Sequence, residues 1–234
     1  INSKVDAILL TPLDSDALAA PVEKAMDAGI PVIVIDSAVN TDKYTSFIAT
    51  DNVAGGRMAM ERLIESIGGS GEVVVVTALA GIPSNDARGQ GPEEYAPTVD
   101  GVTVLPQQHC LDQAEAMTAT ENVIIGNPNL KGIFATFNRG ALGAAQAIVS
   151  KGKAGEIKMV AFDADADEIK LLEDGTIDAL VVQQPYEMGK IGIEYAVKAL
   201  NGEEVPKTVA PEVVIATKDN MNDEAVHKVL YPKG

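Results

Sequence analysis

The stretch AGIPVIVIDS, residues 28–37, joins a helix pattern to a complete strand pattern. Gly29 follows Ala28 at a point where a helix C-terminus favours a residue that tolerates positive φ. The nearly continuous Val and Ile that follow are typical of a strand buried on both faces, as in a parallel sheet covered by helices. The strand ends in Asp36 and Ser37, so polar side chains stand at its carboxyl end. This stretch predicts one helix–strand unit of an α/β fold.

The same alternation continues along the chain. Strands are expected at Val5–Leu10, Pro31–Asp36, Ser46–Thr50, Glu72–Ala78, Val102–Pro106, Gly132–Thr136, Ile157–Asp163, Ala179–Gln183 and Val213–Thr217. Helices are expected at Asp16–Ala28, Val53–Ile67, Gln113–Gly126, Gly140–Ser150, Glu168–Glu173 and Met188–Leu200. Strand–helix alternation at this density predicts a doubly wound α/β fold with parallel sheets and right-handed crossovers.

One region departs from this pattern. Residues 90–101 should supply a helix, but Pro92 and Pro97 interrupt them. Pro92 is compatible with a first helical turn, whereas Pro97 would break a helix interior. Either the helix here is short or the sequence is unusual at this point, and we interpret Ser84–Arg88 as a polar loop.

Composition limits the function classes. The net charge is −16, from 18 Lys and Arg against 34 Asp and Glu. Such an acidic surface argues against nucleic-acid binding and against anionic membrane surfaces. The single Cys110 excludes an intramolecular disulfide, and no apolar run approaches the ~18 residues of a membrane helix. Residues 1–4 lack Met and a signal peptide, so we expect the chain to start at an internal point.

Polar side chains follow most of the expected strands, and ligands of open parallel sheets bind at these carboxyl ends. The strand-end residues are Asp36-Ser37, Asp51-Asn52, Ser84–Arg88, Phe137-Asn138-Arg139, Asp163 and Gln183-Gln184. Carboxylates, amides and guanidinium groups can satisfy the vicinal hydroxyls of a sugar or polyol. Any one Asp, Asn or Ser could instead be a helix cap, but Arg88 and Gln183 are poor caps, which favours a binding site for the set.

Four strings in this order, residues 5–16, 28–37, 48–52 and 160–164, resemble type I periplasmic binding proteins of the ribose-binding family. The resemblance covers essentially the whole chain. It implies two doubly wound parallel-sheet lobes joined by a multi-crossing hinge. The first lobe would comprise residues 1–50 and 185–212, and the second residues 51–184 and 213–234. Relatives carry a further strand–helix–strand–helix segment and a stacking aromatic before this point, so the first lobe is expected to be incomplete at its N-terminus.

The resemblance also implies site positions. Asp36, with Ser37 beside it, matches the family's first-lobe carboxylate, and Arg88 matches its second-lobe arginine. Asp163 and Gln183 match its second carboxylate and its glutamine near the hinge.

The Asn that ends a strand in the family falls at Phe137 by strict spacing and at Asn138 with a one-residue shift. Leu111 stands near a family aromatic. These departures leave the particular sugar open.

The function implied is high-affinity binding of a small sugar or polyol by the substrate-binding component of an ABC importer. The lobes would close around the ligand. The expected partner is a membrane permease, and the chain should be monomeric, without cofactor or enzymatic activity. Its precursor would carry a signal peptide for the periplasm or for a lipid anchor at the cell surface. The alternative is the ligand-sensing core of a lactose-repressor-type regulator, which resembles the same fold.

Three other motifs could indicate a calcium site, a His–Cys site or a phosphate-binding loop. Asp163, Asp165, Asp167 and Asp174 have calcium-loop spacing, but Glu168 stands where the loop needs Gly, and the Asp residues suit a helix N-terminus. His109 and Cys110 are neighbours on a strand, so they point to opposite faces and suit neither catalysis nor metal binding. Gly68–Gly71 lacks the Lys of a phosphate-binding loop and is expected to be a turn.

Overall fold

The computed structural model describes residues 1–232 and divides the chain into two compact units. The first unit consists of Ile1–Asp51 and Gln184–Glu212, and the second of Asn52–Gln183 and Val213–Gly234. The chain therefore passes from one unit to the other three times.

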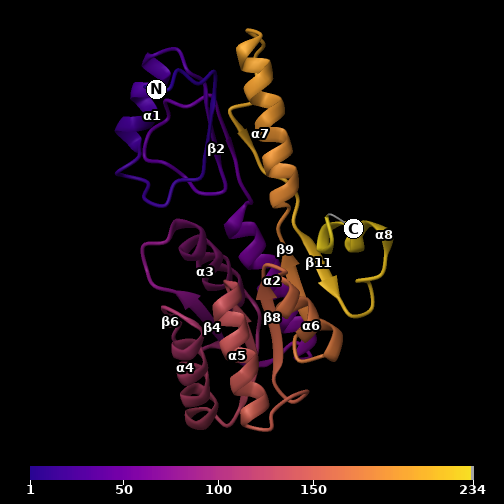
Figure 1. Ribbon diagram of the computed structural model, residues 1–234. Helices are drawn as coiled ribbons and strands as arrows, with labels where there is room; N and C mark the ends of the chain where they lie inside the picture. Colours follow the sequence, from indigo (N-terminus) through magenta and orange to yellow (C-terminus); the bar gives the residue numbers. More distant parts are fainter. Residues whose placement is uncertain (233–234) are drawn as a thin grey trace. The chain divides into compact units, whose positions relative to one another are not determined.

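The first unit contains a parallel sheet between two helices (Figure 1). Among its described residues the strand order is β1-β2-β3-β10, with β1 at Ile8–Leu10, β2 at Val32–Ile35, β3 at Ser46–Ile48 and β10 at Thr208–Val209. The helices are α1 (Ala19–Asp27) and α7 (Pro185–Leu200). Val32 and Val34 pack with α1, whereas Ile33 between them packs with Met188 of α7. This alternation explains why β2 is apolar on both faces.

The described residues of the second unit form a seven-stranded sheet in the order β11-β9-β8-β7-β4-β5, with β6 also paired to β4. Its strands are β4 (Gly71–Ala78), β5 (Val102–Val104), β6 (Gln108–Cys110), β7 (Leu130–Ala135), β8 (Lys158–Phe162), β9 (Ala179–Val182) and β11 (Val214–Thr217). Its helices are α2 (Asn52–Ser66), α3 (Pro83–Tyr95), α4 (Gln113–Gly126), α5 (Asn138–Ser150), α6 (Ala166–Asp174) and α8 (Glu224–Leu230), with a 3₁₀ turn, η1 (Ala96–Thr98), after α3. All pairs are parallel except β11 with β9.

Helices cover both faces of this second sheet. Val73 and Val75 of β4 pack with α2 on one face. Val74 and Val76 pack with α4 and α5 on the other. The α/β fold class predicted from the sequence, with doubly wound parallel sheets, is thus confirmed. Among residues 1–232, no helix is both long and apolar enough to cross a membrane.

The expectation of a polar loop at Ser84–Arg88 is wrong, because these residues form the first turns of α3. Pro83 occupies the first helical turn, Pro92 lies inside the helix, and Pro97 falls in η1 after the helix has ended. The inner face of α3 consists of polar and small residues, namely Asn85, Arg88, Gly89, Gly91 and Pro92. It therefore lacks the apolar periodicity from which a helix is usually predicted. The short elements β6, β10 and α8 were also not expected.

Glycines allow α2 and α3 to pack at very close range. A Cβ atom added to Gly56 of α2 would lie 2.1 Å from the backbone oxygen of Arg88, and one added to Gly91 of α3 would lie 2.3 Å from the oxygen of Val53. Both neighbours are backbone atoms of helices, so they cannot turn aside as a side chain can. This close packing of α2 against α3 determines how far the backbone of Arg88 lies from the sheet.

We predict that Gly56→Ala destabilises the protein by about 2 kcal/mol or more, because the methyl group must push the two helices apart. Thermal and urea unfolding measure this change. Gly126→Ala is the matched control, since an added Cβ there meets no atom within 4 Å. The control should be neutral or slightly stabilising. Equal stability of the two variants would contradict the close packing.

Candidate functional site

Three of the expected residues meet at the carboxyl edge of the second unit's sheet. Asp163 directly follows β8, Gln183 directly follows β9, and these strands pair in parallel. Gln183 Nε2 donates to Asp163 Oδ1 at 2.6 Å, and Arg88 Nη1 lies 3.8 Å from Asp163 Oδ2. The Asp163 side chain is 31% exposed, whereas that of Arg88 is only 5% exposed. A carboxylate that solvent can reach thus stands above a buried cation.

Arg88 is held by groups from several elements. Its Nε donates to Asn52 Oδ1 at 2.8 Å, and its Nη1 donates to the backbone oxygen of Thr136 at 2.9 Å. Its guanidinium lies over the ring of Phe162, 3.9 Å from the ring centre. A planar guanidinium group held in this way has one orientation, and a fixed orientation is required for recognising a ligand oxygen.

The strand-end aspartates share an unusual backbone conformation. Asp163 has φ +83° and Asp36 has φ +68°, both in the left-handed region that favours glycine. In each case the backbone N–H still pairs with the adjacent strand: Asp163 N with Val181 O at 3.0 Å, and Asp36 N with Ile48 O at 2.8 Å. The chain then turns sharply away. Such conformations are costly for non-glycine residues and are concentrated at binding and catalytic sites.

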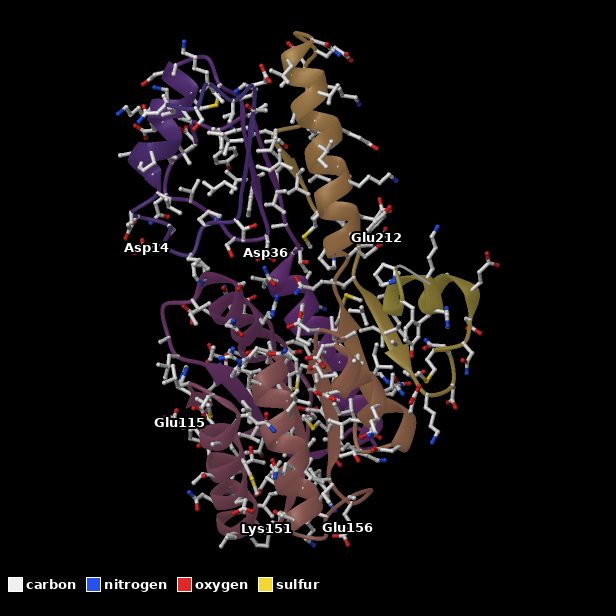
Figure 2. The ribbon with its side chains drawn as sticks, viewed as in Figure 1. Asp14, Asp36, Glu115, Lys151, Glu156 and Glu212 are labelled. Carbon is white, nitrogen blue, oxygen red and sulfur yellow. The ribbon has the colours of Figure 1, made fainter. Side chains whose placement is uncertain are left out.

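Asp36 and Ser37 lie in the first unit, directly after β2 (Figure 2). Ser37 Oγ lies 3.3 Å from Asp36 Oδ2, and Ser37 N donates to Ile35 O at 2.8 Å. Both side chains are partly exposed. They form the polar strand end of the first unit, as Asp163 and Gln183 do in the second.

Phe137 and Asn138 mark the junction of β7 and α5. Phe137 is the N-cap residue of α5, is half-buried, and its ring lies against Gly140, where an added Cβ would be 2.6 Å from the ring. Asn138 is the first helical residue, and its Nδ2 donates to Asp165 Oδ2 at 2.8 Å. The next residue, Arg139, is exposed.

The calcium-like spacing around Asp165 serves a helix start. Asp165 Oδ1 accepts hydrogen bonds from the backbone of Asp167 and Glu168, both at 3.0 Å, while Glu168 Oε2 accepts one from Asp165 N. This reciprocal pair is a capping box. Within the described part of the chain, no group of three or more His, Cys, Asp or Glu residues could hold a metal ion.

Glu168 is a buried carboxyl group beside this cluster. It is fully buried, and its Oε1 has no hydrogen-bond partner among the described residues. Burial raises the pKa of Glu168 to about 8, and the nearby charges of Asp163 and Asp165 act in the same direction. The hydrogen bond from Asp165 N and the charge of Arg88 lower this pKa, but by less. Glu168 is therefore mainly neutral at pH 7 and adds no negative charge beside Arg88 and Asp163.

Sequence reasoning missed two buried threonines beneath this edge, Thr77 and Thr136, and placed their neighbour Asn85 in a polar loop. Thr136 Oγ1 lies 2.8 Å from Thr77 Oγ1 and 2.9 Å from Asn85 Oδ1, and all three residues are buried. Asn52 was expected only as one of several strand-end residues, and Glu168 only as part of a helix. A polar residue placed between apolar neighbours of a buried strand, such as Thr77, is the one signal that could have indicated this network.

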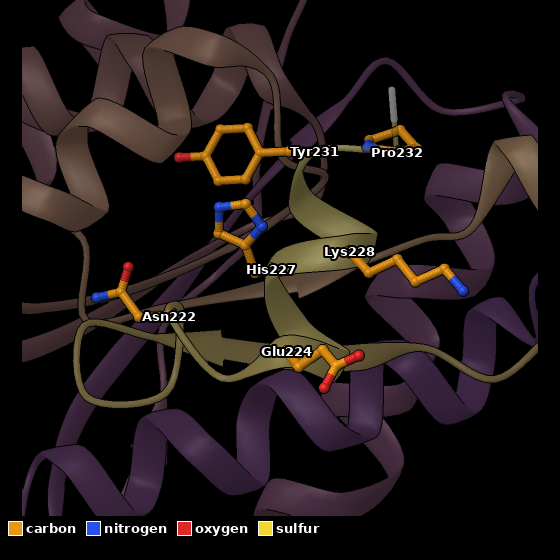
Figure 3. A pocket seen from close by; sticks show the side chains of 6 residues that line it. All are labelled: Asn222, Glu224, His227, Lys228, Tyr231 and Pro232. Atoms are coloured by element: carbon orange, nitrogen blue, oxygen red, sulfur yellow. The ribbon is translucent and has the colours of Figure 1, made fainter. Parts of the chain in front are cut away.

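Other candidate features lie apart from this cluster. Figure 3 shows an open hollow around α8, lined by Asn222, Glu224, His227, Lys228, Tyr231 and Pro232, and none of these is a strand-end residue. Cys110 is buried, and burial raises the pKa of its thiol to about 11. Its neighbour His109 contacts the backbone oxygen of Ala78 through Nδ1. A thiol that stays protonated at neutral pH is a poor nucleophile.

Comparison with known families gives a match to the periplasmic binding protein domain over residues 1–204. The chain belongs to this family. Among curated proteins it is similar to the ribose import binding protein RbsB of Bacillus subtilis, with 34% identity over 218 residues, 93% of this chain and 70% of that protein. It is also similar to the D-allose-binding periplasmic protein of Escherichia coli, with 31% identity over 90% of this chain and 71% of that protein.

Solved structures agree with this assignment. An ABC transporter solute-binding protein from Agrobacterium vitis with bound D-fucose superposes with a TM-score of 0.90 at 38% identity, covering 98% of this chain and 81% of that one. A second one from the same organism, bound with α-D-tagatopyranose, gives 0.91 at 34% identity, with the same coverage of 98% and 81%.

As a periplasmic binding protein, the chain resembles transport proteins and not enzymes. The matched relatives do not favour the alternative of a regulator core.

We predict that Glu168→Gln stabilises this periplasmic binding protein, increasingly so as the pH rises from about 5 to 8. The unfolded chain releases the Glu168 proton near its ordinary pKa of 4.5, whereas the folded protein keeps it up to about pH 8. Folding therefore loses stability over that window, by up to a few kcal/mol, and Gln removes the loss.

Urea unfolding at several pH values measures this effect. Glu173→Gln, which alters an exposed glutamate of the same helix, is the matched control and should follow the parent curve. If the Glu168→Gln curve also ran parallel to that of the parent protein, Glu168 would be ionised in the folded state.

Proposed function

We propose that this protein binds a small sugar or sugar-like polyol as the substrate-binding component of an ABC importer. The observation that supports it most is the Asp163 carboxylate, presented in a left-handed turn between Gln183 and the anchored Arg88. Proteins of similar sequence are named for ribose and D-allose, and a solute-binding protein of similar structure contains bound D-fucose. The strand-end residues and the similar proteins thus both support a sugar as the ligand.

The chemistry of the cluster suits vicinal hydroxyl groups. A carboxylate accepts hydrogen bonds from two neighbouring hydroxyls, an amide both donates and accepts, and a guanidinium donates to two oxygens at once. A buried hydroxyl without a partner costs free energy, so a sugar site needs several such groups in fixed positions. In our proposal, Asp163 accepts from the sugar, Arg88 donates to it, and Gln183 orients Asp163.

The first unit contributes a second polar strand end. We propose that Asp36 and Ser37 are sugar-contacting residues of the first unit, and that Phe137 or Asn138 is a further sugar-contacting residue of the second unit.

The family also suggests a cellular role. We propose that the protein is exported to the periplasm or anchored to the cell surface, that it acts as a monomer, and that it delivers its sugar to a membrane permease. The acidic charge of −16 is compatible with a soluble carrier of neutral ligands and does not favour nucleic acid as a partner.

Asp163→Asn tests the binding role. Asn tolerates the left-handed backbone and has the same size, but it removes the charge that accepts the hydroxyls. Affinity for the best-bound sugar should fall about ten-fold to a hundred-fold, because each hydrogen bond to a charged group contributes about 1.5–3 kcal/mol. Calorimetry of the full-length protein against a panel of pentoses, hexoses and polyols provides the ligand and the dissociation constants.

The matched control is Asp167→Asn. Asp167 lies four residues after Asp163, its side chain is exposed, and the substitution removes the same charge. It should bind like the parent. Unchanged affinity in Asp163→Asn, together with a large loss of apo stability, would mean that Asp163 serves the fold and not the ligand.

A further inference from the structure

Apolar side chains occupy one part of the carboxyl edge of the second sheet. Leu79 directly follows β4 and is 44% exposed, and Leu111 directly follows β6 and is 60% exposed. Phe137, two residues after β7, is half-buried. Two exposed leucines and a half-buried phenylalanine on three neighbouring strand ends are unusual for a surface that water alone covers.

The strand register brings these positions together. β4 pairs with both β6 and β7, and Ala78 is the register partner of Cys110, so Leu79 and Leu111 extend a matched pair. On the other side, Ala135 of β7 is the partner of Ala161 of β8. Counting two residues onward places Phe137 level with Asp163. The apolar residues Leu79, Leu111 and Phe137 therefore lie along the same edge as the polar residues Asp163 and Gln183, and Phe137 is next to Asp163 in the register.

Two polar groups beside Leu111 are already engaged by the fold. The Leu111 N–H donates to Glu115 Oε2 at 2.8 Å, and Asp112 Oδ1 accepts from the backbone of Ala114 and Glu115 at 2.9 and 3.0 Å. A ligand that lies along this edge thus meets hydroxyl partners near Asp163 and Gln183, and carbon near Leu111 and Leu79.

We infer that the preferred ligand is a deoxy sugar, which turns its hydroxyl groups to Asp163 and its methyl or methylene carbon to the surface of Leu79, Leu111 and Phe137. This inference rests on the proposed sugar-binding function and names the substrate class of that same site. A hydroxyl pressed against Leu111 and Leu79 would lose water without gaining a partner, whereas a carbon that carries only hydrogen gains from being buried there.

Matched pairs of sugars test this preference, because their members differ in one oxygen atom. The full-length protein is titrated with D-galactose and D-fucose, L-mannose and L-rhamnose, D-glucose and 6-deoxy-D-glucose, and D-ribose and 2-deoxy-D-ribose. In the pair that binds most tightly, the deoxy member should bind about ten-fold or more tightly than its hydroxylated partner.

Two variants link the preference to the surface. Leu111→Asn offers hydrogen bonds to the missing hydroxyl, so it should reduce the preference for the deoxy member by about five-fold or more. Leu79→Ser should act in the same direction. Ile125→Asn, at an equally exposed apolar residue near the far end of α4, is the matched control and should leave the ratio unchanged. Thermal melts establish that each variant is folded.

The outcomes separate the two proposals. If sugars bind and the hydroxylated member binds as well as or better than the deoxy member, the inference is overturned and sugar binding stands. A deoxy preference that neither variant alters would overturn the assignment to Leu79 and Leu111, and these residues would then face another partner, such as the permease. If no sugar of either kind binds, the proposed function itself fails.

Discussion

The buried guanidinium of Arg88 is the constraint on which the rest of the second unit's edge depends. A charge removed from water is tolerated only when it is hydrogen-bonded and faces an opposite charge. Here the partners include groups that are distant in sequence: Asn52 at the start of α2, Thr136 after β7 and Asp163 after β8. Satisfying one cation therefore fixes how one helix and two strand ends lie relative to one another.

The packing of α2 against α3 follows from the same constraint. Arg88 of α3 reaches Thr136 and Phe162, and Gly56 and Gly91 allow the close approach of α2 and α3 because neither residue has a side chain at the contact. Larger residues would raise α3 and move the guanidinium away from Asp163. The neutral state of Glu168 completes the arrangement, because a second anion there would compete with Asp163 for Arg88.

The fold could be predicted from the sequence because its signals are local. Runs such as Val73–Val76 are apolar on both faces, and glycines stand after helix ends, so element type and order follow from neighbours along the chain. The helix α3 could not be predicted in this way, because its buried face is made of polar and small residues. Its reason for being helical lies in contacts with α2, which no local pattern reports.

The residues of the candidate site also fall into two groups, those that a local pattern indicates and those whose role depends on contacts with distant residues. Asp36, Asp163 and Gln183 were predicted because a strand end is a local feature, and the structure places each of them directly after its strand. Asn52 was predicted only as one of several strand-end residues and Glu168 only as part of a helix, because their roles depend on where Arg88 and Asp165 arrive in space.

The most direct measurement is the dissociation constant of Arg88→Lys for the best-bound sugar, with thermal unfolding of the unliganded protein recorded alongside. Lysine keeps the charge but cannot donate through a planar fork to Asn52 and Thr136 while also facing Asp163 and a ligand. A loss of affinity of about ten-fold or more is predicted, with a folded unliganded protein. Sugar binding as tight as in the parent protein would contradict the central role of Arg88.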